Sequence, residues 1–131
     1  MRKNLILAST LLFSLVTFSQ ATLVNTKWKP QAESPRIQHL EFKKDTLLVL
    51  FTNGRQPEVM SFSHRHDSLL IKKISGEGGA CAIGAEGLYR IEWLADGEKL
   101  VFSNINDVCP GRVRGFITNP FERVRSENPK N

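Results

Sequence analysis

The stretch CAIGAEGLYRIEWLADGEKLVFSNINDVCPGR, residues 81–112, decides the fold. Apolar side chains occupy every second position in its first half: Tyr89, Ile91 and Trp93. Charged side chains stand between them, which is the pattern of a β-strand with one buried face. Asp96-Gly97 follows, and both residue types tolerate the positive φ that a tight hairpin turn requires. We therefore expect two antiparallel strands on either side of this turn.

Similar strand patterns fill the chain from residue 22 onward. We expect eight strands, at residues 23–28, 37–42, 46–51, 58–63, 68–74, 88–93, 100–105 and 114–124, the last interrupted at Asn119-Pro120. Beyond a short turn at residues 31–34, no segment has a clear helical period, and no C-terminal helix is expected. An open meander would leave two unpaired edges, and closure removes them. The sequence thus predicts an all-β fold, an antiparallel up-and-down meander closed into a barrel of about eight strands.

The first 21 residues predict an export signal. Arg2 and Lys3 precede an apolar run at residues 5–18, and Ser19-Gln20-Ala21 offers small residues at both positions that a signal peptidase reads. The run is shorter than the roughly 18 to 20 residues that a helix needs to span a bilayer. We expect residues 1–21 to be a cleaved signal peptide, and residues 22–131 to form one exported domain, periplasmic or extracellular, without a membrane span.

Cys81 and Cys109 are the two cysteines of the chain. In an oxidising compartment such a pair predicts a disulfide more strongly than a redox or metal site. Closing a loop of this length contributes about 3 to 4 kcal/mol to stability in the chain-entropy treatment. We therefore expect the bridge to hold a modest core together.

The charge pattern argues against nucleic acid as a partner. The formal net charge is +5 at pH 7, and Arg2 and Lys3 contribute two of these charges. The remaining basic residues are scattered among acids, and no basic run is interleaved with aromatic residues. A local anion site is compatible with this pattern.

Several short motifs resemble those of lipocalins and the wider calycin group. Asn25-Thr26-Lys27-Trp28 begins the meander, and Arg123 or Arg125 lies near its end. In that family a tryptophan on the first strand packs under an arginine from the last strand, which implies a structural contact between Trp28 and Arg123.

A narrower resemblance involves the segment around the cysteines. Cys81, Gly87-Leu88-Tyr89 and Asp107-x-Cys109-x-x-Arg112 resemble small exported bacterial proteins described as lipocalin-like. A weaker rival resemblance is that the order Cys81, Gly87-x-Tyr89, Cys109 is similar to the META domain of HslJ-type exported proteins. That family continues past its last cysteine with a helical segment and further strands, whereas 22 residues follow Cys109 here.

Asp107 and Arg112 lie on either side of Cys109. A charge-assisted hydrogen bond between them could span the Cys109-Pro110-Gly111 turn. We expect a structural clasp that fixes the loop around the disulfide. The alternative is an arginine that recognises an anion.

The inward-facing aromatic residues are the candidate ligand contacts. An eight-stranded barrel is just wide enough to be filled by side chains or to hold one small ligand. If it is hollow, aromatic side chains would line the pocket and a few polar groups would orient the ligand. The candidates are Phe42, Phe62, Tyr89, Trp93, Phe102 and Asn104. The other interpretation is that the aromatic residues only form the core.

Residues for catalysis or metal binding are sparse. The serines lie in ordinary strand or turn contexts, without a nucleophile elbow. Acid–base candidates are Glu41, Glu86 and Glu92, and the histidines are His39, His64 and His66. The spacing of these groups favours solvated side chains over metal ligands. We expect no catalytic residue, no metal and no cofactor, and lean towards a protein that is not an enzyme.

The function that the sequence favours is non-covalent binding of a small apolar or amphipathic molecule in the barrel. One alternative is an exported protein inhibitor or interaction module that binds a protein partner through loops such as residues 76–86. A cofactor-free barrel enzyme is the other alternative, and it would require acid and base groups that converge at a cavity mouth.

Overall fold

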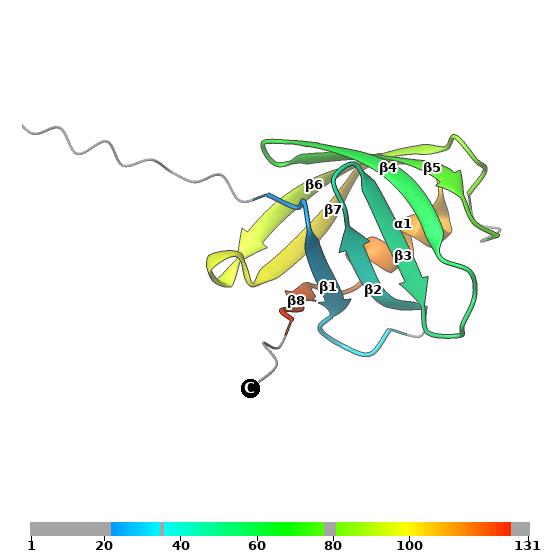
Figure 1. The fold of residues 1–131 in the computed structure, drawn as a ribbon. Coiled ribbons are helices and arrows are strands. Elements are labelled where there is room, and N and C mark those ends of the chain that lie inside the picture. Colours follow the sequence, from blue (N-terminus) through cyan, green and yellow to red (C-terminus); the bar gives the residue numbers. More distant parts are fainter. Residues whose placement is uncertain (1–21, 35, 78–80, 127–131) are drawn as a thin grey trace, which may run out of the picture.

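The computed structural model describes residues 22–34, 36–77 and 81–126. Within these ranges the chain forms eight strands, one α-helix and one short 3-10 helix (Figure 1). The elements are β1 (Thr26–Pro30), β2 (Ile37–Phe42), β3 (Thr46–Phe51), β4 (Glu58–Arg65), β5 (Ser68–Ser75), β6 (Glu86–Leu94), η1 (Ala95–Gly97), β7 (Lys99–Asp107), α1 (Pro110–Ile117) and β8 (Phe121–Arg123). The predicted signal peptide, residues 1–21, lies outside the described residues.

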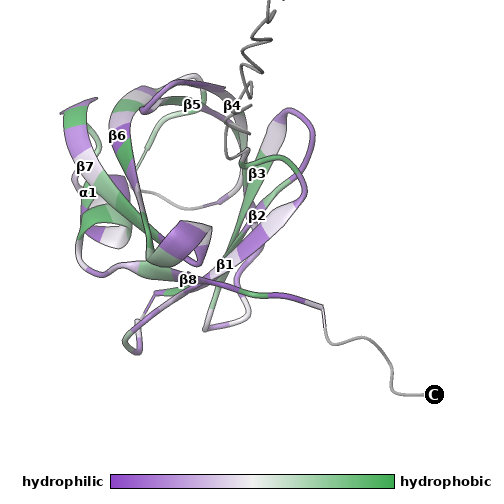
Figure 2. Cartoon of the chain, turned by 90° about the vertical axis from the view of Figure 1, so that its left-hand side faces the viewer, coloured by the Kyte–Doolittle hydropathy of each residue, from purple (hydrophilic) through white to green (hydrophobic). Residues whose placement is uncertain are grey.

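The strands form a closed barrel in sequence order, and β8 returns to pair with β1. All neighbouring strands are antiparallel. Figure 2 shows the sheet curving around a common axis. The predicted all-β fold, with an antiparallel up-and-down meander closed into a barrel, is confirmed. Among the described residues, no helix has the length and apolar character of a membrane span.

Because consecutive strands run in opposite directions, the connections between them alternate between the two ends of the barrel. One end, which we call the helix end, carries the connections at residues 31–36, 52–57, 76–85 and 108–120, the last of which contains α1. The other end, which we call the turn end, carries the shorter connections at residues 43–45, 66–67 and 95–98. The two ends therefore differ in how much chain is available to build a site.

The predicted strand at residues 114–124 is wrong in its first half. Residues Pro110–Ile117 form α1, and only Phe121–Arg123 form a strand. Pro110 occupies the first turn of the helix, where its fixed φ and missing N–H are tolerated. The buried side chains of α1 are Arg112 and Phe116, which are four residues apart and share one face. The helix was missed because its eight residues are too few to display a helical period.

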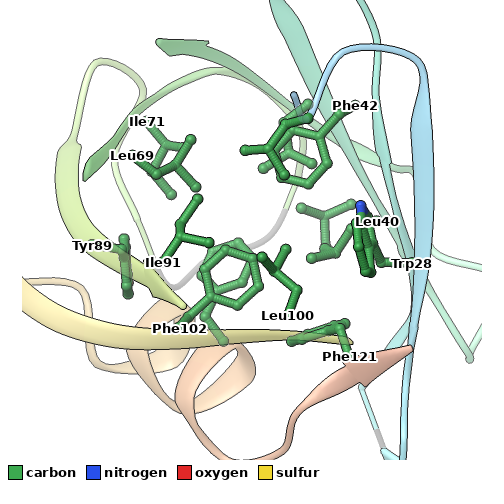
Figure 3. Packing of buried hydrophobic residues seen from close by; sticks show 14 of the residues in the cluster. Trp28, Leu40, Phe42, Leu69, Ile71, Tyr89, Ile91, Leu100, Phe102 and Phe121 are labelled. Atoms are coloured by element: carbon green, nitrogen blue, oxygen red, sulfur yellow. The ribbon is translucent and has the colours of Figure 1, made fainter. Parts of the chain in front are cut away.

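The core consists of inward-facing side chains from the strands and from α1. On β6, Tyr89 and Ile91 are buried while Arg90 and Glu92 are exposed, as the alternation predicts. Figure 3 shows labelled side chains from β1, β2, β5, β6, β7 and β8 directed into a shared interior. Phe102 is central to it, because its ring lies 5.3 Å from Phe116 and 5.4 Å from Phe121, between ring centres. Aromatic packing therefore fills this part of the barrel.

Candidate functional site

A cavity of about 380 Å³ lies at the helix end of the barrel. Its volume falls in the range of small-molecule sites. All four connections at this end contribute to its lining, through Arg36, Asn53, Arg55, Cys81, Gly111, Arg112, Gly115 and Phe116. The barrel wall supplies the remainder: Ile37, Val49, Phe51, Glu58 and Met60. Segments far apart in sequence thus meet around one space.

The cavity runs from an exposed polar mouth to a buried base that is mostly apolar. Arg36, Asn53 and Arg55 are exposed. In contrast, Met60 and Phe116 are buried, with 1% and 2% of their surface accessible. Glu58 and Arg112 are buried lining residues as well. A molecule in this space would therefore meet apolar carbon beside two paired charges at one end, and exposed guanidinium and amide groups at the other.

Helix α1 is held against the barrel by close packing. The backbone carbonyl of Cys109 accepts the first helical hydrogen bond, from the N–H of Val113, at 3.0 Å. On the inner face of the helix, Phe116 packs edge-on against Tyr89, with ring centres 5.3 Å apart. Gly115 lies so close to β2 that a Cβ there would be 2.9 Å from Cδ1 of Ile37. The helix therefore serves as one wall of the cavity.

Asp107 and Arg112 form a buried bidentate ion pair. Nε of Arg112 donates to Oδ2 of Asp107 at 2.6 Å, and Nη2 donates to Oδ1 at 2.9 Å. The remaining guanidinium nitrogen, Nη1, donates to the carbonyl oxygen of Ala85 at 3.1 Å. Asp107 also accepts hydrogen bonds from the backbone N–H of Cys109, at 2.9 Å, and from the Tyr89 hydroxyl. The pair thus joins the end of β7, the start of α1, the β5–β6 connection and β6.

The protonation of this cluster follows from its contacts. Burial would raise the pKa of Asp107, but hydrogen bonds from Arg112, Tyr89 and the Cys109 N–H outweigh burial and hold that pKa below its ordinary value. Burial raises the pKa of Tyr89, and its hydrogen bond to the Asp107 carboxylate raises it further. Asp107 and Arg112 are therefore both charged near neutral pH, and Tyr89 is a neutral donor.

The disulfide lies beside this cluster. The Cα atoms of Cys81 and Cys109 are 5.6 Å apart, and the bond ties the β5–β6 connection to the residue that precedes α1. Because Cys81 also lines the cavity, the bridge forms part of its wall.

A second buried ion pair, Glu58 with Lys73, borders the cavity and was missed in the sequence. Nζ of Lys73 lies 3.4 Å from Oε1 of Glu58 and donates to the carbonyl oxygen of Cys81 at 3.0 Å. The side chains of Lys73 and Glu58 are only 2% and 8% exposed. The burial of Lys73 could have been predicted, because Lys73 follows Leu69 and Ile71 at every second position of β5, on the face that points inward.

None of the six candidate ligand contacts lines the cavity, although Tyr89 and Phe102 pack against its lining residue Phe116. Tyr89, Phe42 and Phe102 are buried in the core. The remaining aromatic candidates, Phe62 and Trp93, are half-buried, in the halves of β4 and β6 nearer the turn end. Asn104 differs from the expectation, since it is exposed on β7. The polar groups at the cavity instead come from connections between strands, with the exception of Glu58 on β4.

Trp28 and Arg123 lie opposite each other where β1 pairs with β8. Cζ of Arg123 is 5.8 Å from the centre of the Trp28 ring, within range of a cation–π contact. The Trp28 indole N–H donates to Oγ1 of Thr26 at 2.7 Å. The structure therefore brings together the two residues that the family resemblance implied, at the point where the barrel closes.

The acid–base candidates do not converge. Glu86 and Glu92 are exposed on β6, and Glu41 is 3.4 Å from the ammonium nitrogens of both Lys27 and Lys43. In the described ranges, no cluster of three or more His, Cys, Asp or Glu side chains is placed to hold a metal ion. Glu41, Glu86 and Glu92 therefore do not form a shared site.

Comparison with protein-family models, with curated proteins and with solved structures returned no match. The closed antiparallel barrel of eight strands is consistent with the lipocalin-like resemblance at the level of fold.

Proposed function

We propose that this chain is an exported lipocalin-like protein that binds a small apolar or amphipathic molecule non-covalently in the cavity at the helix end. The observation that carries the proposal is the cavity of about 380 Å³, with a mostly apolar buried base and a polar mouth. Export is supported by the Cys81–Cys109 disulfide, a bond that persists in oxidising compartments.

The site is well suited to binding because its walls are held by covalent and charged contacts. The disulfide, the Asp107–Arg112 pair and the Glu58–Lys73 pair all involve segments that line the cavity. A cavity whose shape is fixed before a ligand arrives loses less conformational entropy on binding.

Fluorescence titration with N-phenylnaphthylamine, an uncharged hydrophobic probe, tests the proposal. We expect saturable binding by the disulfide-bonded protein, and loss of that binding in Val49→Trp, which fills the buried base. Leu70→Trp is the matched control, because Leu70 is 40% exposed on the outside of β5. Equal binding by the two variants would place the probe elsewhere and contradict the proposal.

A second candidate function is binding of a protein partner through the surface beside the disulfide. Ile83 is 71% exposed and Val108 is 84% exposed, and they lie two residues from Cys81 and next to Cys109, respectively. Exposed apolar side chains on a rigid support are a common feature of interaction surfaces. The double variant Ile83→Ser/Val108→Ser should abolish capture of a partner from the exported fraction while leaving probe binding unchanged.

A further inference from the structure

We propose that the ligand of this cavity carries an anionic head group, an oxyanion such as a carboxylate, sulfate or phosphate, bound between Arg36 and Arg55 at the mouth. This inference rests on the proposed binding function and specifies the class of ligand. Both arginines line the cavity, and both are exposed.

Among the described residues that line the cavity, Arg36 and Arg55 are the charged side chains without a partner of opposite charge. Its other charged lining residues are Arg112, which pairs with Asp107, and Glu58, which pairs with Lys73. Across the described ranges, Arg36 and Arg55 form no ion pair with a carboxylate. The mouth therefore carries a net positive charge, while the charges deeper in the cavity wall cancel in pairs.

The two arginines come from backbone segments that are tied to each other. The backbone N–H of Thr52 donates to the carbonyl oxygen of Arg36 at 3.0 Å, and Ile37 pairs with Phe51 across β2 and β3. The backbone N–H of Arg55 donates to Oδ1 of Asn53 at 3.1 Å. The first two contacts fix the two segments relative to each other, and the third fixes the turn that carries Arg55, before any ligand binds.

Phe51 joins the charged mouth to the apolar base. The guanidinium carbon of Arg55 lies 5.1 Å from the centre of the Phe51 ring, so the ring supports this side chain by a cation–π contact. Phe51 also lines the cavity, together with the buried Val49 on the same strand. An amphiphile can therefore place its head on the guanidinium groups and its tail against Phe51 and Val49.

A neighbouring smaller cavity extends the positive surface. Its volume is about 210 Å³, it shares Arg36 and Gly115 with the first cavity, and it adds Arg114. Planar guanidinium groups bind oxyanions through pairs of hydrogen bonds, a geometry that an ammonium group does not offer. An oxyanion at Arg36 would thus lie in the positive field of more than one arginine.

Ligands that share one tail and differ in the head group test the proposal. Decanoate, decanol and decylammonium are titrated against the disulfide-bonded protein, with decyl sulfate and decyl phosphate added to identify the preferred oxyanion. We expect decanoate to bind about tenfold more tightly than decanol, as hydrogen bonds to a charged group imply. Arg36→Gln and Arg55→Gln should each remove most of this preference, because each weakens decanoate binding more than decanol binding.

Arg65→Gln is the matched control, because it removes the same charge at the turn end, where β4 finishes. Circular dichroism of every variant establishes that the barrel is folded. Equal affinity for decanoate and decanol would overturn the anion inference while leaving the binding function intact. If no member of the series binds, both proposals fail.

Discussion

Gly87 and Asp107 face each other across the pairing of β6 and β7, and the carboxylate of Asp107 occupies the space that a side chain at Gly87 would need. A Cβ at position 87 would lie 2.8 Å from Cγ of Asp107 and 3.0 Å from Nη2 of Arg112. The glycine of the Gly87-Leu88-Tyr89 motif is therefore part of the ion-pair cluster, although it has no polar side chain.

Gly87→Ala should destabilise the protein by about 1 to 3 kcal/mol, the usual cost of overpacking a buried site. The added methyl group must push Asp107 away from Arg112, since both are packed against it. Urea denaturation followed by tryptophan fluorescence measures the effect. Ser103→Ala, at an exposed position of β7, is the control and should unfold like the native protein. Equal stability of the two variants would show that the cluster tolerates displacement.

Asp107→Asn should lower the free energy of unfolding by about 3 to 5 kcal/mol at neutral pH, because it leaves the buried guanidinium of Arg112 without a compensating charge. The double variant Asp107→Asn/Arg112→Met should be more stable than the single variant, because it removes the buried charge as well. Urea denaturation of all three proteins measures both effects. If Asp107→Asn is as stable as the native protein, Asp107 does not compensate the buried charge of Arg112.

The same carboxylate makes stability depend on pH. Because the folded-state pKa of Asp107 is lowered from the ordinary 3.8, its contribution is complete above that value and is lost as the pH falls through the lower folded-state pKa. Glu41, whose pKa is also lowered, acts in the same direction. We expect the native protein to lose more stability than Asp107→Asn between about pH 5 and pH 2. If the free energy of unfolding of the native protein and that of Asp107→Asn fall equally over this pH range, the prediction is wrong.

Removal of the disulfide should cost about 3 kcal/mol in the chain-entropy treatment. The double variant Cys81→Ser/Cys109→Ser is compared with the native protein by urea denaturation and by titration of the neutral probe. We expect weaker probe binding as well, because Cys81 lines the cavity. Loss of stability with unchanged probe affinity would show that the cavity keeps its shape without the bridge.

Lys73→Met should weaken binding of decanoate more than binding of decanol. The substitution leaves the buried Glu58 carboxylate at the cavity wall without the ammonium group beside it, and an unpaired negative charge there repels an anion. Glu58→Gln/Lys73→Met is the matched control and should recover the preference for decanoate. An unchanged preference in Lys73→Met would mean that the head group binds too far from Glu58 to sense it.

The sequence predicted two kinds of feature: strands in which apolar and polar residues alternate, and the disulfide, for which only one pair of cysteines exists. The alternation from Tyr89 to Trp93 identified β6, and the presence of only two cysteines determined the bridge. The second half of helix α1 was assigned to a strand because the helix is too short to display a helical period and because Ile117 and Thr118 are β-branched, a residue class that favours strands. The packing of Phe116 overrides that preference.

The cavity could not be read from the sequence because its parts are distant in the chain. Arg36, Arg55, Cys81 and Phe116 come from four separate connections, and only the closed topology brings them to one end. The aromatic residues chosen as ligand contacts satisfy the strand pattern equally well as core, and the pattern does not distinguish the two roles. A buried partner for Lys73 could have been predicted, since a lysine on an apolar strand face implies one.

The uneven distribution of connections between the barrel ends has a practical consequence for handling this molecule. The disulfide and both buried ion pairs fasten segments of the helix end, whereas the turn between β4 and β5 consists of His66 and Asp67, both exposed. A dye, an affinity tag or an attachment to a solid surface can therefore be introduced at these two positions without obstructing the cavity. An immobilised sensor built in this way would present the mouth of the barrel to the surrounding solution.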